Sequence, residues 1–187
     1  DALAKDDPRR DFARHIHSSG DHLLKLIEEI LDLSRIETGR MALSLEGVSV
    51  GEVLEDLQAT LSPLARTGHV ALEVVAPATP VNIHVDRTRL RQVLLNLGSN
   101  AIKYNVDGGT VRIATEIHEG RLRIVVADTG RGIPAAKQAD VFQPFNRLGA
   151  ETGSIPGTGI GLTISKRLTE AMGGFIGFRS EIGRAHV

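Results

Sequence analysis

Residues 92–104 constrain the fold most, because at helical spacing they separate into two unlike faces. One face is apolar and the other carries amide and amine groups: Val93, Leu94, Leu97 and Ile102 against Asn96, Asn100, Lys103 and Tyr104. Amides are costly to bury without polar partners. The polar face therefore suits either plain solvation, as on any amphipathic helix, or a pocket that grips a metal-bound polyphosphate.

Bulk composition narrows the classes of partner. The 187 residues can form one sizeable core with an appendage, or two small domains. A net charge of −1 gives no electrostatic case for nucleic acid or for an anionic membrane surface. Without Cys there are no disulfides and no thiolate metal sites. No apolar run approaches the ~18 residues that span a bilayer, so we expect no membrane contact within these residues.

Residues 11–41 show a helical pattern with a period of seven. Apolar side chains recur at that spacing: Ile16, Leu23 and Ile30, and also Leu24 and Leu31. Asp7 and Pro8 suit the start of this helix and Gly39 its end. A helix this long depends on burying its apolar face, so the pattern predicts a partner helix from another chain or from a segment outside these residues.

A change of composition at residues 46–47 marks a predicted boundary between residues 1–46 and a second domain, residues 47–187. The predicted strands are 48–50, 70–75, 81–85, 110–117, 121–127 and 175–180, and the predicted helices are 51–66, 86–105, 135–142 and 160–172. Helices interleaved with antiparallel hairpin strands predict an α+β fold, a two-layer α/β sandwich.

Two glycine-rich segments offer backbone that can approach a ligand closely. Residues 128–132, Asp-Thr-Gly-Arg-Gly, follow a predicted strand, and Asp128 can accept a hydrogen bond from an amine such as that of adenine. Residues 157–162 carry alternate glycines before a helix, where N–H groups and the helix dipole favour phosphate. This second segment follows a loop and lacks the Gly-Lys-Ser/Thr ending, which argues against a dinucleotide fingerprint and a P-loop. Each segment alone also fits a plain structural turn.

The order of these motifs carries a resemblance. The asparagine helix, the Asp-Gly turn, residues 142–145 (Phe-Gln-Pro-Phe) and the Gly-Thr-Gly loop resemble the N, G1, F and G2 boxes of sensor histidine kinases. Those ATP-binding domains belong to the GHKL superfamily, with type II topoisomerases, mismatch-repair ATPases and a heat-shock chaperone. The resemblance covers about residues 35–182 and implies the Bergerat ATP-binding fold. Residues 30–39 resemble the end of the second helix of a HisKA-type dimerisation hairpin, whose first helix would be absent.

The resemblance implies a protein-histidine kinase of two-component signal transduction. Such a domain binds ATP and Mg²⁺ and transfers the γ-phosphoryl to a histidine, for passage to a response-regulator receiver domain. The implied metal ligand is Asn100, through its amide oxygen. Lys103 would neutralise phosphate charge, and Asp128 would read the adenine amino group. The implied cofactor-binding residues are Asn96, Asn100, Lys103, Tyr104, Asp128, Gly130, Gly132, Ile133, Gly157, Thr158, Gly159, Ile160, Gly161 and Leu162.

The resemblance also implies a catalytic set and a lid. The implied catalytic residues are Asn96, Lys103 and Arg147, of which Arg147 would reach the γ-phosphate. Residues 146–156 would form the mobile lid. Phe142 and Phe145 are expected to anchor that lid in the core and not to touch ATP.

The residue type at position 96 distinguishes phosphoryl transfer from ATP hydrolysis. Hydrolysing members of the superfamily place Glu at this position, one turn before the metal-binding Asn, where it activates water. An amide cannot act as a strong general base, whereas phosphoryl transfer mainly needs positioning and charge neutralisation. We therefore expect slow hydrolysis and transfer to an external nucleophile. Two alternatives stay open: a GHKL-type ATPase that couples binding to conformational change, and a non-catalytic dimerisation module.

The chain departs from the family at both ends. His15, His17 and His22 lack the acidic neighbour of the acceptor motif, so the acceptor histidine is expected elsewhere and autophosphorylation by these residues alone is not expected. At the other end, residues 184–187 read Arg-Ala-His-Val, so we expect the last strand to be missing or altered, with an exposed sheet edge. The resemblance further implies a homodimer through residues 11–41 and a cytoplasmic location, whether or not the parent protein is membrane-anchored.

Overall fold

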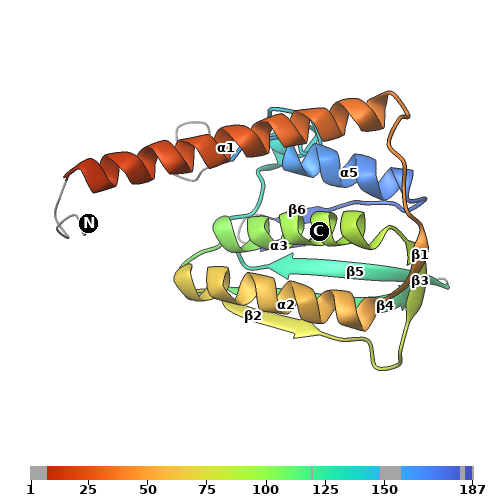
Figure 1. The fold of residues 1–187 in the computed structure, drawn as a ribbon. Helices are drawn as coiled ribbons and strands as arrows, with labels where there is room; N and C mark the ends of the chain where they lie inside the picture. The colour runs from red at the N-terminus through yellow and green to blue at the C-terminus, as the bar shows by residue number, and fades with distance from the viewer. Residues whose placement is uncertain (1–7, 119, 148–156, 182–183, 187) are drawn as a thin grey trace. The chain divides into compact units, whose positions relative to one another are not determined.

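The computed structural model describes residues 8–118, 120–147, 157–181 and 184–186. The chain divides into two compact units, Asp1–Met41 and Ala42–Val187. The first unit contains helix α1, Pro8–Glu37 (Figure 1). Its first residue is a proline, which lacks only an N–H that the first turn leaves unbonded. The predicted Asp7 cap lies outside the described residues.

The end of α1 is closed by Gly39. Its φ of +64° is the left-handed conformation that glycine adopts without steric cost. The N–H of Arg40 donates to the carbonyl of Arg35 at 2.9 Å, as in a helix cap. The predicted helix is confirmed, although it begins and ends earlier in the sequence than residues 11 and 41.

Seven large apolar residues of α1 are exposed. Their exposed fractions lie between 45% and 69%, for Phe12, Ile16, Leu23, Leu24, Ile27, Ile30 and Leu31. None of the helices in the described part of the chain has both the length and the apolar character needed to cross a membrane.

The second unit has two sheets (Figure 1). Strands β1 (Glu46–Ser49) and β3 (Asn82–Val85) pair antiparallel. The larger sheet has five strands in the order β2-β4-β5-β7-β6. They are β2 (Ala71–Val75), β4 (Thr110–His118), β5 (Arg121–Asp128), β6 (Arg179–Glu181) and β7 (Arg184–His186). Only the β2–β4 pair is parallel among the four pairs of this sheet.

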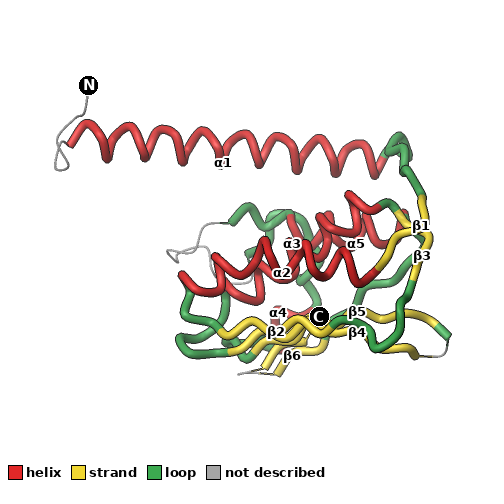
Figure 2. Tube along the Cα trace, turned by 60° about the horizontal axis from the view of Figure 1, so that its bottom comes forward, coloured by secondary structure: helices red, strands yellow, loops and turns green. Residues whose placement is uncertain are grey.

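Helices α2 (Val50–Thr67), α3 (Arg87–Lys103) and α5 (Gly161–Ala171) cover one face of the five-stranded sheet (Figure 2). The short helix α4 (Ala135–Gln138) follows β5. Buried side chains from both layers form the core: Leu57 and Leu61 of α2, Val93 and Leu97 of α3, Ile113 of β4, Val126 of β5 and Leu168 of α5. The two-layer α+β sandwich is confirmed.

Two local predictions of element bounds are wrong. Residues 175–178 are not a strand, since β6 begins only at Arg179 and Phe175 is 87% exposed. A segment without a neighbouring strand has no ladder to join, whatever its apolar pattern. Helix α4 ends at Gln138, and turns follow up to residue 145.

The last strand is not missing. Arg184–His186 forms β7, which pairs with β5 and β6; Ala127 faces His186 and Asp128 faces Ala185. Strand pairing uses backbone N–H and C=O groups, so a sequence unlike the family's can still pair. β7 lies between β5 and β6, so the edge strands of this sheet in the described part of the chain are β2 and β6.

Candidate functional site

The two faces predicted for residues 92–104 are confirmed on α3. The apolar residues Val93, Leu94, Leu97 and Ile102 are buried. The polar residues Asn96, Asn100, Lys103 and Tyr104 are half-buried. The helix ends at Lys103, and Tyr104 is its C-cap, directly after the last helical residue.

The start of α3 is held by Asp86. Its Oδ1 accepts from the N–H of Arg89 at 3.0 Å, and its Oδ2 accepts from the N–H of Ser44 at 3.0 Å. Burial raises the pKa of this carboxyl, but hydrogen bonds from backbone N–H groups, together with the nearby Arg89 charge, hold the pKa below its ordinary value. Asp86 is thus an ionised N-cap, as predicted, and it also binds the segment that precedes β1.

Asn96 connects α3 to α5. Its Nδ2 donates to Oγ of the buried Ser165 at 2.9 Å. Nδ2 of Asn100 in turn lies 3.5 Å from Oδ1 of Asn96, a long hydrogen bond. A Cβ at Gly161 would lie 2.5 Å from that same oxygen, so only glycine lets α5 begin this close to the amide. The orientation turns Oδ1 of Asn100, the atom that can bind a cation, away from Asn96.

The donor set around Asn100 fits a magnesium ion that arrives with phosphates. An amide oxygen is a hard ligand of the kind Mg²⁺ takes, and Mg²⁺ completes its shell with water and substrate phosphates. In the described part of the chain, no group of three or more His, Asp or Glu side chains could hold a metal ion. Among the described residues, Asn100 would therefore supply a single protein ligand to such an ion.

The Asp128 turn lies against the end of α3. The N–H of Gly130 donates to Oδ1 of Asp128 at 2.7 Å, which orients the half-buried carboxylate. A Cβ at Gly130 would lie 2.6 Å from the carbonyl oxygen of Tyr104. The N–H of Arg131 donates to that carbonyl at 3.3 Å, and the Arg131 guanidinium lies 5.6 Å from the Tyr104 ring centre. Two segments that are distant in sequence thus share one wall.

The far side of this turn is bonded to β6. The N–H of Ile133 donates to Oγ of Ser180 at 2.8 Å. Nε2 of Gln138 donates to the carbonyls of Ile133 and Ser180, both at 2.9 Å. Sequence reasoning missed Ser180 and Gln138. No motif marks them, because their contacts are with residues far along the chain.

The second glycine segment meets the same helix. A Cβ at Gly157 would lie 3.6 Å from the Tyr104 hydroxyl. Gly159 has φ +74°, and a Cβ there would lie 2.9 Å from the Phe145 carbonyl carbon. Ile160 is buried, so its side chain anchors the segment and only its backbone can serve a ligand. Its N–H donates to Oγ1 of Thr158 at 3.3 Å, and Leu162 is half-buried.

The two phenylalanines of residues 142–145 differ. Phe142 packs edge-on against Phe178, with 5.8 Å between the two ring centroids. The Phe142 carbonyl accepts a hydrogen bond from Oγ1 of Thr163 at 2.9 Å. Phe145 is 65% exposed, so the expectation that it anchors the core is wrong. Its φ of +63° turns its side chain outward while its backbone meets Gly159. Arg147 is half-buried, and the rest of the predicted lid, residues 148–156, lies outside the described residues.

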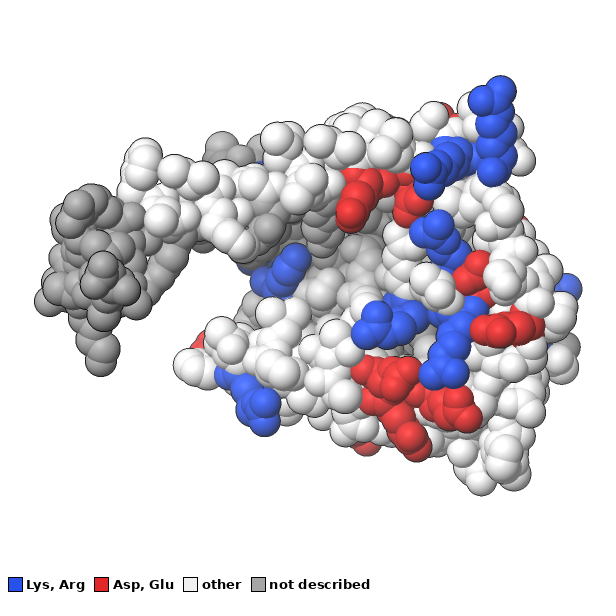
Figure 3. Space-filling view, in the orientation of Figure 1, with Lys and Arg blue, Asp and Glu red and all other residues white. Residues whose placement is uncertain are grey.

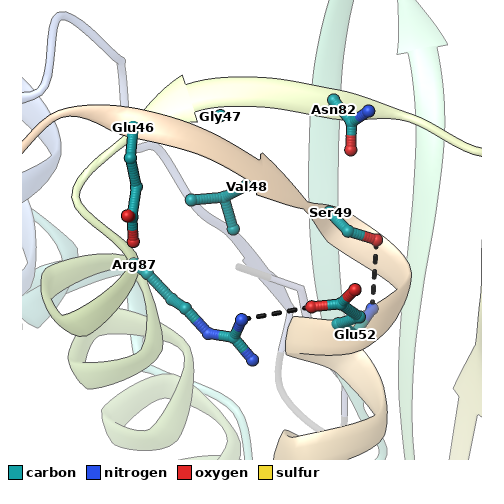
Figure 4. A pocket seen from close by; sticks show the side chains of 7 residues that line it. All are labelled: Glu46, Gly47, Val48, Ser49, Glu52, Asn82 and Arg87. Carbon is teal, nitrogen blue, oxygen red and sulfur yellow. Dashed lines mark hydrogen bonds and ion pairs between the residues drawn. The ribbon is translucent and has the colours of Figure 1, made fainter.

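A separate pocket of about 340 Å³ lies at the start of α2 (Figure 4). Its lining residues are Glu46, Gly47, Val48, Ser49, Glu52, Asn82 and Arg87, none of which was predicted as a site residue. The Arg87 guanidinium donates to Glu52 at 3.1 Å and to Asp56 at 3.0 Å. Acidic and basic side chains lie side by side on this face (Figure 3), so it presents no field of one sign.

Comparison with known proteins identifies a matching family and several similar proteins. Residues 85–186 match the family described as "Histidine kinase-, DNA gyrase B-, and HSP90-like ATPase". The circadian input-output histidine kinase CikA of Synechococcus elongatus is 39% identical over 179 residues, which cover 94% of this chain and 24% of CikA. The chain thus spans about a quarter of that relative.

Two solved structures show the same fold. Full-length ShkA in complex with AMPPNP is 33% identical with a TM-score of 0.78, and the match covers 96% of this chain and 37% of that one. Histidine kinase ThkA in complex with the response regulator protein TrrA is 21% identical with a TM-score of 0.74, over 98% of this chain and 51% of that one. The second likeness is one of fold alone.

Proposed function

The chain belongs to the family of histidine kinase-, DNA gyrase B- and HSP90-like ATPases, and from that premise we propose that it binds Mg·ATP and donates the γ-phosphoryl to a histidine outside residues 1–187. Several of its relatives by sequence are named histidine kinases, among them CikA and DivJ. ShkA, whose fold it shares, was solved with the ATP analogue AMPPNP.

The convergence of two glycine segments on the polar face of α3 carries the proposal. Gly130 lies against the Tyr104 carbonyl, and Gly161 lies against the Asn96 amide. Gly157 approaches the Tyr104 hydroxyl. Two glycine segments that each fit a plain turn are therefore held on the polar face of a single helix. A nucleotide can use such a face along its whole length, with the base near one turn and the phosphates near the other.

We assign the residues as follows. The Asp128 carboxylate accepts a hydrogen bond from the adenine amino group, in the orientation that the Gly130 N–H imposes. The amide oxygen of Asn100 holds Mg²⁺, which when bound neutralises charge on the phosphates. The Lys103 ammonium adds a second positive charge, and Arg147 contacts the γ-phosphate. The backbone of residues 157–162 faces the phosphates at the start of α5.

The environment of Asn96 supports transfer over hydrolysis. Its amide donates to Ser165 and lies near the Asn100 amide, so it orients neighbours and has no basic group to activate water. The proposed reaction therefore needs an acceptor side chain, and ATP turnover without one is slow.

The exposed apolar stripe of α1 supports a homodimer. Seven large apolar side chains that are at least 45% exposed in one chain are buried if two copies of the helix pair. For the onward step we propose a response-regulator receiver domain, the kind of partner with which ThkA was solved. A domain that uses ATP works where ATP is available, so the proposed location is the cytoplasm.

Calorimetry with AMPPNP and Mg²⁺ tests the proposal. We expect binding by the wild type and a clear loss of affinity in Asp128→Asn, in which one carboxylate oxygen becomes an amide NH₂ group that cannot accept the adenine hydrogen bond. Arg121→Gln, at the exposed start of β5, serves as the control and should bind like the wild type. No binding by the wild type, or undiminished binding by Asp128→Asn, would overturn the proposal.

A further inference from the structure

Asn105 lies where three elements of the candidate site meet. It follows Tyr104, the C-cap of α3, and it reaches both the start of β4 and the turn after β5. We call Asn105, Thr110 and Thr129 the Asn105 cluster. None of the three belongs to the predicted site, yet they connect the end of α3 with the Asp128 turn, the two segments that form the proposed adenine site.

Every polar atom of the Asn105 side chain is bonded. Its Nδ2 donates to the carbonyls of Ala101 at 3.1 Å and Thr110 at 3.0 Å. Its Oδ1 accepts from the N–H of Val106 at 2.9 Å and from Oγ1 of Thr129 at 3.3 Å. An amide has two donors and one acceptor oxygen, and all are used here. Such an arrangement fixes the end of α3 relative to β4.

Thr129 extends the connection to the Asp128 turn. Its Oγ1 accepts from the N–H of Thr110 at 2.8 Å, and its own N–H donates to the Thr110 carbonyl at 3.1 Å. The cluster is also tightly packed. A Cβ at Gly109 would overlap Oδ1 of Asn105 and would lie 2.9 Å from the Thr129 hydroxyl. The hydroxyl has two acceptors within reach, Oδ1 of Asn105 at 3.3 Å and the Thr110 carbonyl at 3.5 Å, and both belong to the cluster.

Thr129 links the Asn105 cluster directly to the Asp128 carboxylate, because it is the next residue in the chain. Thr129 stands between Asp128, whose carboxylate faces the proposed base, and Gly130, which orients that carboxylate. A Cβ at Gly130 would lie 3.2 Å from Cα of Asn105, so the turn rests directly on the cluster. Hydrogen bonds weaken steeply when their angle departs from linearity. A small rotation of the turn would therefore cost recognition of the base.

We propose that Asn105 and Thr129 are positioning residues for adenine recognition, which hold the Asp128 carboxylate at a fixed place relative to Tyr104. The inference rests on the proposed function, because it assumes that Asp128 reads the adenine amino group. It goes further in assigning selectivity between adenine and other purines to residues that do not touch the base.

The test compares ADP with inosine diphosphate, which carries a 6-oxo group where adenine has its amino group. Calorimetry gives the ratio of the two affinities. Thr129→Val removes the hydroxyl at similar volume, and Asn105→Asp removes both Nδ2 donations at the same shape. We expect either change to reduce the ADP preference about tenfold, the usual effect of one neutral hydrogen bond. Thr129→Ser, which keeps the hydroxyl, should restore the wild-type ratio.

Thr67→Val is the matched control, since its hydroxyl bonds the Pro63 carbonyl within α2, far from the turn in sequence. It should leave the ratio unchanged. An unchanged ratio in both Thr129→Val and Asn105→Asp, with only a lower melting temperature, would overturn the inference while leaving nucleotide binding intact. A wild type that binds neither nucleotide would overturn the proposed function, and the inference with it.

Discussion

Asn96 shows how one side chain carries both a structural and a functional consequence. The sequence points to Asn96 because it stands where a hydrolysing member of the superfamily carries Glu, the general base that activates water. In the structure the amide also bonds Ser165 of α5 and lies near Asn100. The residue that excludes a general base thus also fixes the orientation of the proposed metal ligand.

Removing the Asn96 side chain should therefore affect stability and binding together. Asn96→Ala leaves the buried Ser165 hydroxyl and the Asn100 amide without this partner, which we expect to cost about 1–3 kcal/mol of unfolding free energy. Urea denaturation measures the cost. Ser99→Ala is the control on the same helix, since the Ser99 hydroxyl bonds only within one turn. Equal stability of Asn96→Ala and the wild type would contradict the bridging role.

The metal assignment makes a separate prediction for Asn100. In Asn100→Ala, the affinity for ADP measured with Mg²⁺ should fall to the value measured with a chelator, because the proposed protein ligand is gone. Affinity in the absence of Mg²⁺ should change little. An ADP affinity that still rises with Mg²⁺ as in the wild type would remove Asn100 from the metal site.

At the scale of helices and strands, the sequence predicts correctly those features that depend on residues close together in the chain. Asp86 as N-cap and Gly39 at a helix end were both predictable, since capping depends on residues close in sequence. Sequence reasoning failed at residues 175–178 and at β7, where pairing with a distant strand decides. The same limit applies to the site: Asn96, Asn100 and Asp128 stood out by type and spacing, whereas Ser165, Gln138 and Ser180 are recognisable only from contacts across the fold.

The Asp86 cap predicts a specific acid sensitivity. Its pKa is lower in the folded chain than in the unfolded chain, so its contribution to stability is present above the unfolded value, about pH 3.9 for Asp, and is lost as the pH falls through the folded pKa. Asp86→Asn keeps a good N-cap but does not titrate. Urea denaturation from pH 6 to pH 2 should show a smaller loss of stability in the variant. Parallel pH profiles of the two proteins would contradict this origin.

At the scale of the whole molecule, we propose that one unit binds the nucleotide and the other forms the dimer. Residues 42–187 hold the proposed nucleotide site, and α1 holds the exposed apolar stripe. We expect residues 1–187 to dimerise through that stripe. Leu23→Lys together with Ile30→Lys, which lie seven residues apart on one side, should shift sedimentation toward monomer while ADP affinity persists.

Glu29→Lys is the control for that change, since at 100° per residue it stands on the side of α1 opposite the apolar stripe. It should leave the dimer intact. A wild type that sediments as a monomer at high concentration would contradict the dimer, but it would not affect the nucleotide site.

The most direct test of the whole account is phosphoryl transfer to a separate acceptor. Residues 1–187 are mixed with radiolabelled ATP, Mg²⁺ and a separate helical hairpin that carries the His-Glu/Asp acceptor motif. We predict label on the acceptor histidine, recognised by its loss in acid and its persistence in base, and no label on residues 1–187 alone. Rapid ATP turnover without the acceptor, or no label on it when nucleotide is bound, would contradict a domain that donates phosphate.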